Sequence, residues 1–74
     1  MRQKTRKVLR LRQLRRAREM TQATLAEKVG LQTQSYCLIE NGRPTSLATA
    51  TKLAQVFGLP IEEVFALVEV PTHV

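Results

Sequence analysis

Residues 21–42 read TQATLAEKVGLQTQSYCLIENG, a stretch with two short helical patterns on either side of a glycine. Thr21 is a residue type that caps helices, because its hydroxyl can accept a hydrogen bond from a free amide in the next turn. Apolar residues follow at helical spacing, at Leu25, Ala26 and Val29. Gly30 can adopt the positive φ that ends a helix, and a second helix is predicted over residues 33–41. Helices this short depend on packing for their stability.

The flanking sequence predicts three more helices. The first is expected over about residues 8–18, with a narrow apolar stripe at Val8, Leu11, Leu14 and Ala17. Ser46 is the expected cap of a fourth helix that ends at Gly58. Its apolar stripe consists of Leu47, Ala50, Leu53, Ala54 and Phe57. Residues 61–65 form a short fifth helix, while residues 66–70 are apolar and could be helix or strand. The predicted fold class is therefore all-α, with five short helices.

Length and composition restrict the classes of function. The chain has 74 residues, one cysteine and one histidine, so it is expected to be a single domain without an internal disulfide or a closed zinc site. Aromatic residues are only 4% of the chain, which predicts a small aliphatic core. A catalytic cleft built from many residues is not expected in such a chain. We predict no enzymatic activity, no metal and no cofactor, and we assign no role to His73.

The charges are distributed unevenly along the chain. Residues 1–18 contain nine of the twelve Lys and Arg residues and no acid, whereas residues 19–74 contain the other three together with all six acids. This asymmetry indicates a polyanionic partner, either nucleic acid or an anionic membrane. A solvated tail or a targeting segment would look similar. No apolar stretch is long enough for a membrane span, and a cytoplasmic, nucleoid-associated protein is expected.

The combined spacing TQ…LA…VG…IENG, followed by FGLP and then EEVF, resembles the Cro-type, phage-repressor-like (XRE-like) helix-turn-helix family. The resemblance covers roughly residues 8–65. It implies a compact, five-helix, lambda-repressor-like DNA-binding domain at residues 8–66, with its motif at 22–41. A flexible basic arm is then expected at residues 1–7 and a C-terminal tail at residues 67–74.

The resemblance also implies which residues contact bases. In this family the second motif helix enters the major groove with its N-terminal residues at the base edges. The matching positions are Gln32, Thr33, Gln34, Ser35 and Leu38. Glutamine can pair with adenine through two hydrogen bonds, whereas Thr and Leu can touch a thymine methyl group. Gln32 could instead cap the helix, and the others could be ordinary surface residues.

Phosphate contacts are implied at Arg10, Arg15, Gln22, Asn41 and Arg43. Gln22 opens the first motif helix, where free amides and the helix dipole attract a phosphate, whereas Asn41 could equally be a turn residue. Arg15 and Glu40 match positions that form a salt bridge in relatives.

The chain departs from the family pattern at three points. The second motif helix has no Lys or Arg, so attraction to phosphates must come mostly from residues 2–18. Tyr36 is larger than the usual aliphatic residue, and its hydroxyl is expected at the surface. Cys37 is expected to be an inert small residue close to the DNA.

The leading hypothesis is a sequence-specific, double-stranded DNA-binding regulator that acts as a homodimeric repressor on a pseudo-palindromic operator. The expected dimer interface is apolar and consists of Ile61, Phe65, Leu67, Val68 and Val70. These residues could instead pack onto the domain itself. An antitoxin or a restriction controller that regulates its own promoter would have the same features. The alternative from another class is a protein-interaction module whose partner is a toxin or regulator, which the weak basicity of residues 19–74 favours.

Overall fold

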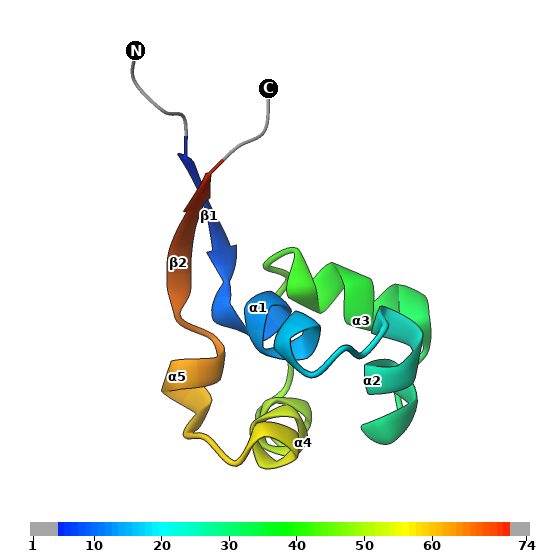
Figure 1. Cartoon of the computed structure of the whole chain (residues 1–74). Coiled ribbons are helices and arrows are strands. Elements are labelled where there is room, and N and C mark those ends of the chain that lie inside the picture. Colours follow the sequence, from blue (N-terminus) through cyan, green and yellow to red (C-terminus); the bar gives the residue numbers. More distant parts are fainter. Residues whose placement is uncertain (1–4, 72–74) are drawn as a thin grey trace.

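A computed structural model describes residues 5–71 of the chain. Within this range there are five helices and one two-stranded sheet. Their order is β1 (Thr5–Leu9), α1 (Arg10–Ala17), α2 (Gln22–Lys28), α3 (Thr33–Glu40), α4 (Leu47–Phe57), α5 (Ile61–Val64) and β2 (Leu67–Pro71). The helices form one body, and the two strands project from it as a ribbon (Figure 1).

The ends of the central helices lie where the sequence predicts them. Thr21 caps α2, since its hydroxyl oxygen accepts a hydrogen bond from the Thr24 amide over 3.0 Å. Ser46 caps α4 by accepting a bond from the Thr49 amide over 3.2 Å. Gly58 ends α4 in the left-handed conformation, with a φ of 66°. These local signals are sufficient to set the boundaries of both helices.

The core is assembled from all five helices. Its buried members are Leu11, Leu25, Ala26, Val29, Tyr36, Ile39, Leu53, Ala54, Phe57 and Val64. Leu25, Val29, Tyr36 and Ile39 fill the space between α2 and α3, and Leu31 is half-buried beside them. Three residues of the predicted stripes are not in the core, and one of them, Val8, lies in β1. Ala17 is exposed at the end of α1, and Leu47, in the first turn of α4, is 74% exposed because the core contacts of α4 begin at Ala50.

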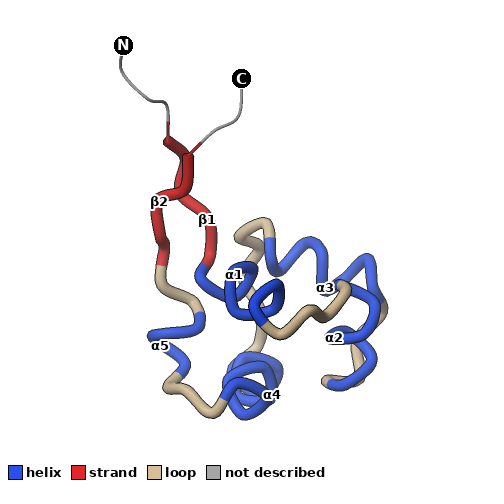
Figure 2. The backbone as a smooth tube through the Cα atoms, viewed as in Figure 1, coloured by secondary structure: helices blue, strands red, loops and turns tan. Residues whose placement is uncertain are grey.

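The five predicted helices are confirmed, but the fold is not strictly all-α as expected, because β1 and β2 pair in an antiparallel ribbon. The register places Arg6 opposite Val70, Val8 opposite Val68 and Leu9 opposite Leu67. Both strands twist around each other as they leave the helices (Figure 2). The apolar residues near the start of the chain fit a helical period of three, but Val8 and Leu9 instead extend a strand, and α1 begins only at Arg10. The ribbon comprises residues 5–9 and 67–71 and keeps this name below.

The ribbon changes the interpretation of both ends of the chain. Residues 5–7, expected to be part of a flexible arm, form the outer half of β1. Residues 67–71, expected to be a tail, form β2, which resolves the open choice between helix and strand. The Arg10 amide donates a hydrogen bond to the Ala66 carbonyl over 2.8 Å, and this bond ties the base of the ribbon to α1. The rest of the predicted arm and tail, residues 1–4 and 72–74, lies outside the described residues.

Arg18 joins α1 to α4. Its guanidinium donates hydrogen bonds to the carbonyls of Val56 and Phe57 over 3.1 and 3.4 Å. The same group lies 5.3 Å from the centre of the Phe57 ring. A cation at this place satisfies carbonyls at the end of α4 and complements its dipole. One of the nine N-terminal basic residues therefore has a structural role.

Candidate nucleic-acid interface

The two sides of α3 differ sharply in exposure. Tyr36, Ile39 and Glu40 are buried against the body. The opposite side carries the predicted base-reading residues, all of them exposed: Gln32, Thr33, Gln34, Ser35 and Leu38. Gln32 is at the N-cap position, but its side chain makes no capping hydrogen bond. The Gln32 side chain therefore does not cap α3, and its amide group can bind another molecule.

A basic cleft borders α3 where α1, the start of α2 and the end of α3 meet. We call it the α2 cleft. It measures about 450 Å³ and is lined by Arg12, Arg15, Arg16, Thr21, Gln22, Glu40 and Asn41. The structure thus brings together three of the predicted phosphate-binding residues, namely Arg15, Gln22 and Asn41. The first amides of α2 are close by, which adds the positive end of a helix dipole.

Arg15 and Glu40 form a buried ion pair inside this cleft. Arg15 donates from Nε and Nη2 to the two Glu40 carboxylate oxygens, each over 3.0 Å. Its Nη1 donates to the Met20 carbonyl over 2.7 Å. Arg15 is only 8% exposed and Glu40 only 6%. The geometry gives Arg15 a structural role, since its guanidinium is already occupied by α3 and by the turn before α2.

The ion pair changes the pKa of the Glu40 carboxyl group. Burial alone would raise the pKa of its carboxyl group. The hydrogen bonds from Arg15 are the main influence that opposes this effect, and the pKa of the carboxyl group lies below its ordinary value. The hydrogen bond to Glu40 also raises the pKa of Arg15. Both partners are therefore charged at neutral pH.

The prediction that the Tyr36 hydroxyl lies at the surface is wrong. The whole residue is buried, and its hydroxyl oxygen makes no hydrogen bond with any described residue. Burial, together with the nearby Glu40 carboxylate, raises the pKa of the phenol, which stays neutral. The ring contributes to the core between α2 and α3, and this requirement for volume fixes the side chain even though its polar end lacks a partner.

Gln22 and Cys37 interact across the motif, which the sequence did not indicate. The Cys37 thiol donates to the Gln22 side-chain oxygen over 3.1 Å. This contact leaves the amide nitrogen of Gln22, with its two donors, as the group available to an acceptor such as a phosphate. Cys37 is half-buried beside the cleft and is more than a small filler, because it orients the residue at the start of α2.

Two basic residues of the α2 cleft were missed by the sequence analysis. Arg12 and Arg16 are one turn apart on α1, on the side that faces Gln22 and Asn41. Arg12 also approaches Glu40, with 4.0 Å between Nε and the carboxylate oxygen. The available signal was the i, i+4 spacing of two arginines on one side of α1, away from the buried Leu11.

Two other predicted phosphate contacts lie elsewhere. Arg10 is about 200° around α1 from Arg12, so the two side chains leave the helix on different sides. Arg10 does not line the α2 cleft. Arg43 lies past the end of α3, where it lines a shallow groove together with Ser35, Leu38 and Pro44. The exposed side of α3 is therefore flanked by the α2 cleft and by Arg43.

Comparison with known proteins agrees with this geometry. A family model described as "Helix-turn-helix" matches residues 11–64. The chain belongs to the helix-turn-helix family. Domains of this kind bind double-stranded DNA with the second motif helix in the major groove. The resemblance in the sequence is therefore confirmed, and DNA binding is the activity that the family assigns to α2 and α3.

Archaeal relatives are similar over most of this domain. An uncharacterised HTH-type transcriptional regulator of Methanocaldococcus jannaschii is 39% identical over 56 residues, which are 74% of this chain and 85% of the relative. Another uncharacterised HTH-type transcriptional regulator, from Archaeoglobus fulgidus, is 40% identical over 57 residues, covering 76% of this chain and 81% of the relative.

Two further features bear on the class of protein. No helix within residues 5–71 is both long and apolar enough to cross a membrane. The same residues contain no group of three His, Cys, Asp or Glu side chains that could hold a metal ion.

Proposed function

We propose that this protein is a sequence-specific regulator of transcription that reads double-stranded DNA with α3. The observation that carries the proposal is the uninterrupted exposed run from Gln32 to Ser35, with Leu38 one turn further on the same helix. Gln32 and Gln34 can each form two hydrogen bonds to adenine, and Thr33 or Leu38 can contact a thymine methyl group. A helix that opens with such residues is suited to base recognition.

Phosphate contacts on both sides of α3 would position this helix. The α2 cleft supplies Arg12, Arg16, Gln22 and Asn41 on one side, and Arg43 is on the other. The major groove is bordered by two phosphate backbones, so contacts on either side of the reading helix suit its shape. Arg15 acts indirectly in this arrangement, by holding Glu40 and the end of α3. We leave Arg10 out of the phosphate-binding set, because its side chain leaves α1 on a different side.

The test compares Gln34→Ala with Gln22→Ala. Each variant is measured at one fixed salt concentration on two duplexes, the best-bound sequence and the same sequence with one half-site base pair changed. A bidentate base contact discriminates by about 1–3 kcal/mol, whereas a phosphate contact does not depend on sequence. Gln34→Ala should therefore reduce the affinity ratio between the two duplexes. Gln22→Ala should weaken binding to both and preserve the ratio, and a Gln34→Ala variant with the wild-type ratio would refute base reading by Gln34.

Action as a homodimeric repressor on a pseudo-palindrome is part of the same proposal. The support is an apolar groove of about 300 Å³ between the α3–α4 loop, the base of the ribbon and α5, in which Leu9, Pro44, Ile61 and Phe65 are exposed in part. Leu67, paired with Leu9 at the base of the ribbon, is 62% exposed. Val68 and Val70 are half-buried and share a ribbon face with Val8 and Arg6, so they support the interface less directly.

A protein-interaction module is the second candidate. It is favoured by the absence of Lys and Arg from α3 and by the exposure of Leu38 at 40%. An antitoxin that binds a toxin through such a surface would combine both roles. Retention on heparin that decreases steeply with salt would support DNA binding, whereas a module that binds only protein need not be retained.

A further inference from the structure

A second basic cleft lies outside the helix-turn-helix, between the ribbon and α1. We call it the ribbon cleft. It measures about 400 Å³ and is lined by Arg6, Val8, Arg12, Gln13, Arg16, Val70 and Pro71. Three of these seven residues are arginines, and none of them is acidic. Guanidinium groups gathered without a carboxylate among the lining residues are suited to binding an anion, and phosphate matches their fork of donors.

The pairing of the ribbon explains why Arg6 faces this cleft. Side chains of directly opposite residues in an antiparallel pair lie on the same face of a sheet. Arg6 is opposite Val70, and Val8 is opposite Val68, so these four residues share the face that lies against α1. Lys7 is opposite Glu69 and therefore has its side chain on the other face. Arg6 and Lys7 therefore have their side chains on opposite faces of the ribbon, and of these two residues Arg6 is the one on the face next to α1.

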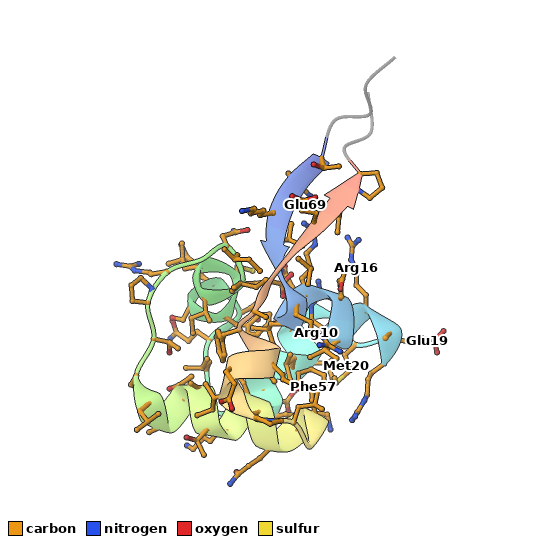
Figure 3. The ribbon with its side chains drawn as sticks, turned by 90° about the vertical axis from the view of Figure 1, so that its left-hand side faces the viewer. Arg10, Arg16, Glu19, Met20, Phe57 and Glu69 are labelled. Carbon is orange, nitrogen blue, oxygen red and sulfur yellow. The ribbon has the colours of Figure 1, made fainter. Side chains whose placement is uncertain are left out.

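The ribbon cleft is continuous with the α2 cleft. Arg12 and Arg16 line both of them, and together these clefts connect Gln22 to Arg6 across the surface of α1. Arg16 is on the side of α1 next to the ribbon, whereas Glu19 points away into solvent (Figure 3). A third cleft, lined in part by Arg6, Lys7, Arg12 and Asn41, connects the ribbon to the end of α3. The positive surface therefore extends from the motif onto β1.

We propose that Arg6, together with Arg12 and Arg16, forms a second phosphate clamp for the duplex that α3 reads. The first clamp is at Gln22 and Asn41, and Arg12 and Arg16 lie between the two clamps. The second clamp holds a backbone phosphate further along the same DNA, beyond the part contacted by the motif. The ribbon is then a DNA-binding element, and pairing with β2 holds Arg6 in place. This inference rests on the proposed function, since it requires DNA to lie against α3.

The experiment measures the salt dependence of binding to a nonspecific duplex, because phosphate contacts do not require a particular sequence. The full chain, Arg6→Gln and the control Lys52→Gln are compared, because Lys52 is an exposed cation on α4 that lines neither the ribbon cleft nor the α2 cleft. Both positions are exposed and both variants lose one charge, so their folding and net charge are comparable. Loss of one phosphate contact lowers the slope of log K against log salt by about 0.9. The affinity lost in Arg6→Gln should therefore shrink by about 3.5-fold between 50 and 200 mM salt, with a distinctly smaller effect in Lys52→Gln.

Interference mapping with ethylated phosphates gives a second readout. The wild-type protein should be sensitive to a phosphate that Arg6→Gln tolerates, whereas Lys52→Gln should retain the wild-type pattern. Equal slopes and equal interference patterns for all three proteins would overturn the clamp while leaving DNA reading by α3 intact. Failure of the wild-type protein to bind any duplex would instead overturn the proposed function, and the clamp with it. An Arg6→Gln effect no larger than that of Lys52→Gln would also overturn the clamp, because it would show only the loss of one charge from the whole protein.

Discussion

Glu40→Ala is expected to destabilise this protein more than any substitution of an exposed acid. Arg15, which is only 8% exposed in the structure, loses its carboxylate partner in this variant. Removal of one partner from a buried pair costs about 3–5 kcal/mol. Small domains have total stabilities of about 5–15 kcal/mol, so this is a large part of the whole. With a urea slope of about 1–3 kcal/mol per molar, the unfolding midpoint should fall by at least about 1 M.

Glu62→Ala is the matched control. Glu62 is exposed in the first turn of α5, where its interaction with the helix dipole is worth about 0.3–1 kcal/mol. A double variant, Arg15→Met with Glu40→Met, should recover most of the stability lost in Glu40→Ala, because it leaves no unpaired buried charge. Urea unfolding followed by circular dichroism measures all four proteins. Equal midpoints for Glu40→Ala and Glu62→Ala would refute the role given to this pair.

Three further predictions follow from the same contacts. The pKa of Glu40 is lower in the folded than in the unfolded chain. The charged Glu40 side chain therefore contributes its full stability above its ordinary pKa of 4.5, and this contribution is lost as the pH falls through the folded pKa. A pH series of unfolding midpoints should show this loss of stability in acid for the wild type and not for Glu40→Gln. Tyr36→Phe should leave stability unchanged or raise it by about 1 kcal/mol, because the buried hydroxyl has no hydrogen-bond partner among residues 5–71, and a loss of that size would show that the hydroxyl is bonded. Leu67→Lys, at the base of the ribbon, should shift sedimentation from dimer to monomer, while Leu47→Lys, a comparably exposed leucine in the first turn of α4, should not; identical sedimentation of the two would place the interface elsewhere.

The helical part of the fold could be predicted because its signals are local. Thr21 and Ser46 accept bonds from amides three residues later, and Gly58 reaches its left-handed conformation without help from distant residues. The ribbon could not be predicted in this way. Leu9 pairs with Leu67 across almost the whole chain, and no local pattern identifies a partner at such a separation. Without its partner, the segment at the start of the chain fits a helix about as well as a strand.

The candidate site, like the fold, could be predicted from the sequence only in part. The exposed side of α3 could be predicted, because burial of Tyr36 and Ile39 on one side of a helix leaves Gln34 and Leu38 on the other. The separate roles of the nine clustered basic residues could not be predicted from the sequence. Arg15, Arg18 and Arg16 look alike in the sequence, yet the first holds Glu40, the second caps α4 and the third faces the clefts. Their roles depend on which helix packs opposite each one.

The central claim is that α3 reads a DNA sequence, and selection of bound sites from a pool of random duplexes tests it most directly. The account predicts enrichment of two related half-sites whose centres are about 10–10.5 base pairs apart, the spacing at which a dimer presents both reading helices to one side of the duplex. The same selection with Gln34→Ala should yield a motif that has lost its preference at one position of each half-site. Recovery of no enriched motif, from a pool that the protein nevertheless binds, would contradict sequence reading by α3.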